Sequence, residues 1–280
     1  MPFRPSGTFG PAIAMFYPVY GMFFYSFTSI FQEARQVTKD RKMRKHRGLA
    51  PEDTVFFDPG RRRLLRRAVS ELSWLLQRGY APKASLELVG NHYQLSERER
   101  MALVHTASSR QERRAPLSFN ALRGRELCID GFNLLITLES WLGGGIILRG
   151  MDGCYRDIAN VHGSYSFREE TQKAVEMAGR AFQQAGVKEG LWLFDRPVSN
   201  SGRTAGLINI TAEAEGYPMR AETSDRVDET LKRSEKVVVT ADSSILDSAA
   251  EWFDLAGWLI EQNPGEGNII DLAGEESGTG

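Results

Sequence analysis

The second half of the chain alternates short apolar segments with helical segments, and this alternation constrains the fold more than any other feature. Strand-like apolar segments occupy residues 127–130, 191–195 and 237–240, with weaker ones at 219–223 and 252–254. Segments with helical periodicity separate or follow them, at residues 132–142, 169–184, 204–214, 226–233, 243–250 and 256–262. Such alternation is typical of a parallel sheet with helices packed on it. We therefore predict an α/β domain over residues 116–263 that begins with a linker at 116–125.

Three of these strands end in an aspartate: Asp130, Asp195 and Asp242 each follow an apolar run. The carboxyl ends of parallel strands share one edge of a sheet, and neighbouring strands lie ~5 Å apart, so two such carboxylates can hold one hard cation. Two further acids, Asp225 and Asp228, stand at the start of the helical segment before the last clear strand. Each aspartate taken singly also suits a helix N-cap, so capping and metal binding both stay open.

The net charge of −1 conceals two halves of opposite sign. Residues 1–126 contain 22 Lys and Arg against 11 Asp and Glu, net +11, whereas residues 127–280 contain 13 against 25, net −12. A composition of 41% hydrophobic and 25% charged residues excludes a disordered polymer and a multi-span membrane protein. The basic half keeps nucleic acid open as a partner.

Residues 43–115 are predicted to form a small, basic, all-helical domain. Residues 61–80 place leucines on one helical face and arginines on the other, and a second helix over 82–89 should stop at the turn pair Gly90-Asn91. A third helix begins after Ser96, which can form a capping box with Glu99, and runs to about residue 108. This order of helices indicates a helix-turn-helix-like unit, and the arginine face either contacts nucleic acid or is simply solvated.

Residues 5–32 carry no charge and are rich in aromatic residues. The segment is long enough to span a bilayer, but Pro11, Pro18 and Gly21 interrupt it. We expect residues 1–42 to be an extension outside the fold, with translation starting at Met43, and a membrane anchor is the alternative. Residues 264–280 are rich in Gly and Glu and are expected to be disordered.

The two cysteines, Cys128 and Cys154, cannot form a disulfide framework, and the four histidines lack zinc-ligand spacing. Reduced thiols are typical of a cytoplasmic protein, which is the predicted location.

Two segments of the α/β half resemble a known nuclease pattern. IDGFNLL (129–135) and VVVTADSSILD (237–247) look like the first and last signatures of the NYN and PIN ribonuclease-like superfamily. The resemblance implies a three-layer α/β/α sandwich with a parallel sheet of order 3-2-1-4-5, and phosphodiester cleavage that depends on Mg²⁺ or Mn²⁺. It implies metal ligands from the acids already named, with Asn133 positioning the first: Asp130, Asp195, Asp242 and one of Asp225 or Asp228.

Most of the chain, about residues 45–262, is also similar to the domain of unknown function 434 family. The residues that carry this resemblance are RGY (78–80) and LVGNHY (88–93) in the helical part and DRPVSNSG (195–202) in the second half. The last motif departs from the looser second motif of ordinary PIN nucleases.

The DRPVSNSGR run brings hydroxyls, an amide and two guanidinium groups to a predicted helix N-terminus, where anions bind favourably. We expect a substrate phosphate to be bound there, and the alternative is that the serines only cap the helix; the residues concerned are Arg196, Ser199, Asn200, Ser201 and Arg203. Residues 148–157 are considered as a lid near the same edge.

The leading hypothesis is an endoribonuclease with a two-metal site, whose basic helical domain supplies the phosphate-binding surface. RNA is favoured over DNA, and a homodimer stays open. The rival is a non-catalytic nucleic-acid-binding or regulatory protein whose PIN-like half senses a nucleotide or a metal. A phosphatase is disfavoured because IDGFN lacks the second aspartate of a DxD pair.

Overall fold

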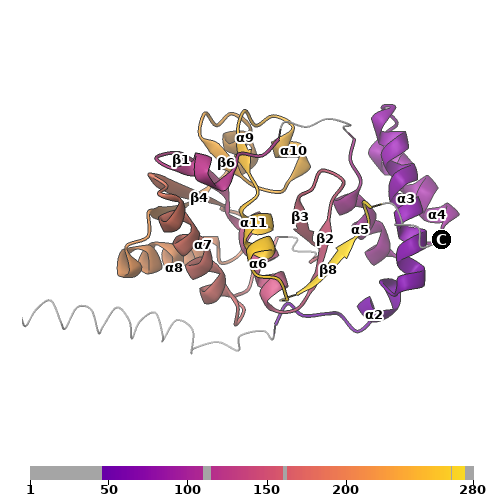
Figure 1. The fold of residues 1–280 in the computed structure, drawn as a ribbon, viewed down its shortest axis with the longest axis horizontal. Helices are drawn as coiled ribbons and strands as arrows, with labels where there is room; N and C mark the ends of the chain where they lie inside the picture. Colours follow the sequence, from indigo (N-terminus) through magenta and orange to yellow (C-terminus); the bar gives the residue numbers. More distant parts are fainter. Residues whose placement is uncertain (1–45, 110–114, 160–162, 266, 275–280) are drawn as a thin grey trace, which may run out of the picture. The chain divides into compact units, whose positions relative to one another are not determined.

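The computed structural model describes residues 46–109, 115–159, 163–265 and 267–274 (Figure 1). All of the described residues belong to one compact unit. The predictions for residues 1–42, namely the extension and the alternative membrane anchor, lie outside the described residues. Among the helices that the structure describes, none is long and apolar enough to cross a membrane.

A parallel five-stranded sheet forms the centre of the second half. Its strands lie in the order β5-β4-β1-β6-β7 and all pair in parallel. Their bounds are β1 (Glu126–Asp130), β4 (Glu189–Asp195), β5 (Met219–Ser224), β6 (Val237–Val239) and β7 (Trp252–Phe253). All of the strands predicted from the alternating pattern are therefore present.

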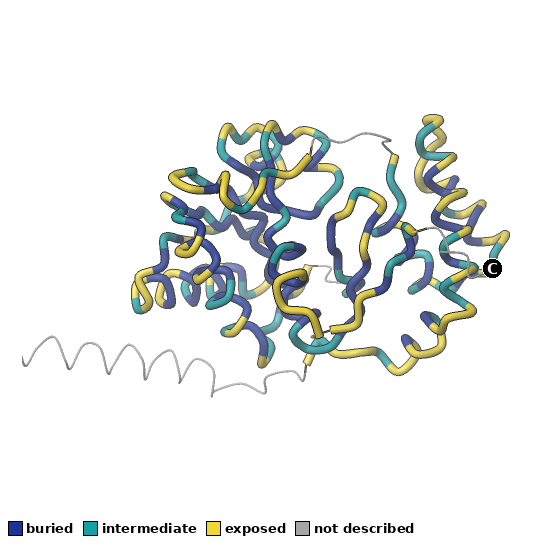
Figure 2. The backbone as a smooth tube through the Cα atoms, in the orientation of Figure 1, coloured by how far each residue is buried: buried dark blue, intermediate teal, exposed yellow. Residues whose placement is uncertain are grey.

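Helices cover both faces of this sheet. Successive side chains of a strand point to opposite faces, so alternate residues pack in two different hydrophobic cores. On one face, Ile129, Trp192 and Val239 pack against the longer helices; on the other, Cys128 and Val238 pack against the shorter ones. The longer helices are α6 (Gly131–Leu142), α7 (Thr171–Ala185), α8 (Ser201–Glu215) and α11 (Leu255–Gln262), and the shorter ones are α9 (Val227–Lys232) and α10 (Ser243–Leu246). Figure 2 shows the strands of this sheet largely in the buried colour.

The helical region contains α2 (Asp53–Phe56), α3 (Pro59–Gln77), α4 (Pro82–His92) and α5 (Glu97–Thr106). The predicted capping box of α5, between Ser96 and Glu99, is confirmed. The predicted end of the second helix at Gly90-Asn91 is wrong, because α4 continues to His92 and the chain turns at Gln94, which has φ 50°. Gly90 lies inside the helix where the Arg100 guanidinium packs on it, and a Cβ there would stand 2.1 Å from Arg100 Nη1.

A second sheet, which the sequence did not predict, connects the helical region to the larger sheet. It has the order β3-β2-β8, with β2 antiparallel to β3 and parallel to β8. The strands are β2 (Ile146–Arg149), β3 (Tyr155–Asp157) and β8 (Asn268–Asp271). Strand β2 contacts both α5 and α6, and Figure 1 shows this sheet between the helical region and the larger sheet.

Three domain-level predictions need correction here. Residues 148–157, considered as a lid, are mostly β2, β3 and the turn between them. The tail was predicted to be disordered over 264–280, but 268–271 form β8 and Leu272 is buried. The helical and α/β parts are not separate units, because Ile146, Leu148 and Ile270 share one core with the leucines of α3 and α5.

The start of the described chain is held by a buried ion pair. Arg47 Nε donates to Glu139 Oε2 at 2.7 Å, and the two side chains are 7% and 0% exposed. Glu139 lies near the end of α6 and also accepts from Thr171 and from the hydroxyl of Tyr165. The segment around Arg47 is therefore part of the fold. Both cysteines are buried, and neither belongs to a disulfide.

Candidate carboxylate site at the sheet edge

Asp130 ends β1, the central strand, and is both a helix cap and a buried carboxylate. Its side chain accepts from the backbone N–H of Asn133 at 3.3 Å, which caps α6. Its second oxygen accepts from Thr240 Oγ1 at 2.9 Å, and the residue is only 9% exposed. The capping interpretation is therefore correct for Asp130, but it does not account for the burial of the charge.

Burial is the main reason why the pKa of Asp130 rises from 3.8 to about 7. The hydrogen bonds from Thr240 and Asn133 oppose this rise, while the carboxylates of Asp242 and Asp195 add to it. The electrostatic neighbours that raise this pKa are thus the two other strand-terminal aspartates. A bound cation would favour the ionised form of all three.

Asp242 follows β6, the neighbour of β1, and caps the short helix α10. Its side chain accepts from Ser244 N at 2.7 Å, and its own N–H donates to Thr240 Oγ1 at 3.1 Å. The side chain of Asn133 reaches the same loop, where its Oδ1 accepts from Ala241 N at 2.9 Å. Asn133 therefore fixes Asp130 through its backbone and the Asp242 loop through its side chain.

Asp195 is the last residue of β4, which pairs with β1 on the side opposite β6. Its pKa is raised by burial and by the carboxylate of Asp228, which lies in the first turn of α9. Asp225 instead pairs with Arg196 at 3.3 Å, and their side chains are 66% and 60% exposed. The structure thus makes Asp228 an electrostatic neighbour of Asp195 and directs Asp225 to a surface ion pair.

The described part of the chain contains no group of three or more His, Cys, Asp or Glu side chains arranged to hold a metal ion. Asp130, Asp195, Asp228 and Asp242 interact electrostatically in pairs without converging on one point. Mg²⁺ commonly uses one or two protein carboxylates and completes its octahedron with water and substrate phosphate, so convergence of three is not required.

The loop expected to bind phosphate uses most of its side chains for internal bonds. Asn200, which has φ 64°, donates from Nδ2 to Tyr165 O at 2.7 Å, and Ser199 Oγ donates to the same oxygen at 3.4 Å. Ser201 Oγ donates to Arg196 O at 3.2 Å, and the Arg203 guanidinium lies 5.0 Å from the centre of the Phe167 ring. The alternative that the serines cap the helix is wrong, because α8 has no side-chain cap and both serine hydroxyls donate to backbone carbonyls instead. The prediction of phosphate binding at this loop stays a prediction.

Three residues near this edge were not singled out as site residues from the sequence. Thr240 binds Asp130 as described, and its place in the Thr-x-Asp motif was the available signal. Arg156 in β3 is 7% exposed and donates to the Ala241 carbonyl at 2.7 Å. The His105 side chain at the end of α5 interacts electrostatically with Arg156 and Asp242, and burial lowers its pKa to about 4.

The arginines of α3 are only partly available to a ligand. Arg61 pairs with Glu99, Arg62 donates to Phe57 O, and Arg66 donates to Asp271 O at 3.2 Å. Arg63 and Arg67 are exposed. At least three arginines of this face are thus used in intramolecular contacts.

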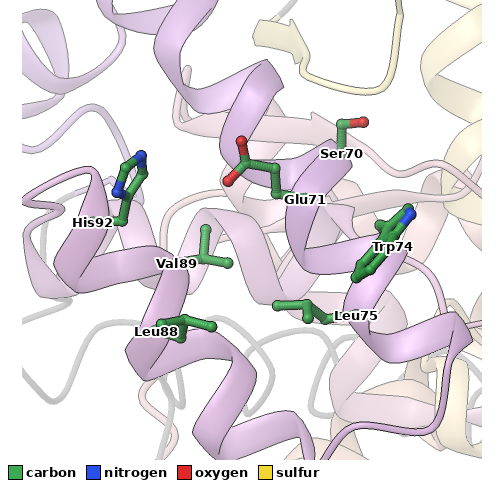
Figure 3. A pocket seen from close by; sticks show the side chains of 7 residues that line it. All are labelled: Ser70, Glu71, Trp74, Leu75, Leu88, Val89 and His92. Carbon is green, nitrogen blue, oxygen red and sulfur yellow. The ribbon is translucent and has the colours of Figure 1, made fainter.

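A groove of about 530 Å³ lies between α3 and α4 (Figure 3). Its walls are mainly apolar, and two of its side chains, Trp74 and Leu88, are 51% and 63% exposed. The lining residues are Ser70, Glu71, Trp74, Leu75, Leu88, Val89 and His92. They come from the helical region and include none of the strand-terminal aspartates.

Two family models match consecutive segments of the chain. Residues 64–117 match the model described as "Protein of unknown function (DUF434)", which confirms that resemblance for the helical region but limits it to this part. Residues 119–258 match the model described as "Domain of unknown function (DUF5616)", which runs from the short helix η1 (Phe119–Leu122) into α11. No solved structure matches this chain.

One curated relative is the protein of Methanocaldococcus jannaschii described as "Uncharacterized protein MJ0935". The two chains are 32% identical over 188 residues, which is 66% of this chain and 89% of the relative. The relative thus shares most of its length with this chain. The DUF5616 model covers half of the chain, and this protein therefore belongs to the DUF5616 family.

Proposed function

We propose that this protein is a metal-dependent ribonuclease that hydrolyses phosphodiester bonds at the edge formed by Asp130, Asp195, Asp228 and Asp242. The observation that carries the proposal is the burial of Asp130 on the central strand, with two further carboxylates as its electrostatic neighbours. Mutual repulsion of this kind is costly in a resting protein. A divalent cation bound between the carboxylates would offset their repulsion and give the arrangement a function.

The donor set fits Mg²⁺ or Mn²⁺, because both ions prefer carboxylate oxygens over sulfur or imidazole ligands. When bound, such an ion supplies Lewis acidity for water activation and for the charge of the phosphate. The chain's own part is to hold the carboxylates: Thr240 and Asn133 fix Asp130, while the caps of α6 and α10 fix the directions of Asp130 and Asp242.

The topology supports a PIN-like interpretation of the α/β part. Numbered along the chain within the larger sheet, the strand order is 3-2-1-4-5, the order that the resemblance implies. The chain reverses its direction of winding between β1 and β6, and ligands of parallel sheets bind outside the carboxyl ends at such a point. Asp130 and Asp242 flank this position.

The helical region supplies the positive charge that the acidic half lacks. Arg63, Arg67 and Lys83 are exposed on α3 and α4, and contacts of this kind bind phosphates without reading sequence. RNA is the proposed substrate and its backbone the proposed ligand of these helices.

The test is cleavage of a labelled single-stranded RNA in the presence of Mn²⁺ or EDTA by the wild-type protein, Asp130→Asn and Asp225→Asn. We expect divalent-dependent cleavage by the wild type, a loss of at least about a hundredfold in Asp130→Asn, and near wild-type rates in Asp225→Asn, whose carboxylate faces a surface arginine. Equal cleavage by wild type and Asp130→Asn would overturn the proposal. Salt-sensitive RNA binding without turnover would favour the non-catalytic rival instead.

A further inference from the structure

We propose that Arg156 is a positioning residue of the carboxylate edge, which locks the segment carrying Asp242 and joins it to the end of α5. The catalytic meaning of this role rests on the proposed function, but the locking itself does not. Arg156 belongs to β3, in the small sheet between the helical region and the larger sheet.

The Arg156 guanidinium binds both residues that flank Asp242. Its Nε donates to the Ala241 carbonyl at 2.7 Å, and its Nη2 donates to Ser243 Oγ at 3.3 Å. The N–H of Ala241 donates to Asn133 Oδ1 at 2.9 Å. Ala241 is thus held at both its N–H and its carbonyl by two side chains from different elements, and Asp242 follows directly.

The same guanidinium binds the end of α5. Its Nη1 donates to the backbone carbonyl of His105 at 3.1 Å. The His105 side chain interacts with Asp242, so α5 reaches the edge with its last turn.

The positive charge of Arg156 can be buried here because the Asp152 carboxylate neutralises it. Nη1 and Nη2 donate to the two Asp152 oxygens at 2.9 and 2.6 Å, and the side chains of Arg156 and Asp152 are 8% and 6% exposed. Gly150 makes room for the group, since a Cβ there would stand 2.4 Å from Arg156 Nη1. A lysine cannot replace this planar fork, because one ammonium cannot reach acceptors on four residues at once.

The experiment compares wild type, Arg156→Lys and Arg98→Lys. Arg98 is a matched control because it forms a two-bond pair with buried Asp53 in the helical region. Hydrogen exchange of the backbone amides of residues 241–246 is measured without metal or RNA, and kcat and KM are measured for Mn²⁺-dependent RNA cleavage. We expect Arg156→Lys to speed exchange at least tenfold and to lower kcat at least tenfold with little change in KM, while Arg98→Lys changes none of these.

If Arg156→Lys does not fold, Asp152→Asn replaces it, with the same direction expected. Exchange or kcat in Arg156→Lys that matches Arg98→Lys would overturn the proposal. A wild-type protein without divalent-dependent cleavage would refute the proposed function alone; the exchange comparison would then still decide whether Arg156 locks the Asp242 segment.

Discussion

Replacing Asp130 by asparagine should stabilise the protein at high pH while it removes the proposed activity. The substitution keeps the shape and the hydrogen bonds, because an amide oxygen can accept from Asn133 N and an amide N–H can donate to Thr240 Oγ1. What it removes is a carboxylate that is 9% exposed and has two carboxylate neighbours.

The size of the effect follows from the pKa of Asp130, which burial raises from 3.8 to about 7 in the folded protein. Below pH 3.8 both the folded and the unfolded chain hold the proton, so this group does not change the free energy of unfolding. As pH rises toward 7, the unfolded chain releases the proton first and the free energy of unfolding falls. At ~1.4 kcal/mol per pKa unit, the full loss above pH 7 is about 4 kcal/mol.

Urea unfolding in EDTA at pH 5 and pH 8 measures this difference. The free energy of unfolding of Asp130→Asn should exceed that of wild type by about 4 kcal/mol at pH 8 and by about 1.5 kcal/mol at pH 5. The control is Asp225→Asn, an exposed ion-pair partner whose loss changes stability by about 1 kcal/mol or less. If Asp130→Asn is no more stable than wild type at pH 8, Asp130 is not a destabilising buried carboxylate.

Adding Mn²⁺ in place of EDTA at pH 8 should stabilise wild type by about 2.7 kcal/mol at a Mn²⁺ concentration of a hundred times Kd. The same Mn²⁺ should leave the stability of Asp130→Asn unchanged.

Three further substitutions test other parts of the structure by urea unfolding. Thr240→Val removes the hydroxyl that donates to Asp130. It should lower the free energy of unfolding by about 1.5–3 kcal/mol at pH 8 and by less at pH 5, where Asp130 is more protonated. Equal losses at both pH values would show that this hydroxyl does not stabilise the carboxylate. Ile270→Ala should cost about 2–5 kcal/mol because Ile270 is 1% exposed in the core shared by β8 and the helices, whereas a disordered tail predicts no change. Glu139→Gln should cost about 3–5 kcal/mol because it removes the carboxylate that is hydrogen-bonded to the buried Arg47 guanidinium. A neutral result would mean that the pair does not anchor this segment.

The larger sheet could be predicted because its signals are local. Val237 to Val239 and the apolar run before Asp195 are recognisable as strands without knowledge of their neighbours, and Ser96 and Glu99 define a helix start by their spacing alone. The second sheet could not be predicted in this way. Strand β3 has three residues, two of them charged, and β8 lies in a Gly- and Glu-rich tail. Their strand conformation comes from pairing with β2, a partner distant from β8 in the sequence.

The candidate site shows the same limit. The positions of Asp130, Asp195 and Asp242 at strand ends follow from the sequence, but the choice between Asp225 and Asp228 does not. Both acids precede or begin α9, and only the fold shows that one faces Arg196 while the other lies near Asp195. The serines and asparagine after Asp195 suggested phosphate binding by composition. The tertiary fold instead gives Ser199 and Asn200 the Tyr165 carbonyl as their partner.

The sequence by itself therefore determined the parallel sheet, the acidic residues at its carboxyl edge and the division of charge between the two halves, because periodicity, strand termination and composition are properties of short segments. Only the tertiary structure decided the burial of Asp130, the part of Arg156 and His105 in the same edge, and the union of the helical and α/β regions around the second sheet. These depend on contacts between residues as far apart as Arg156 and Ala241 or Leu148 and Ile270. Burial and long-range pairing set the pKa of a carboxylate and the position of a loop, and neither is encoded within a single segment.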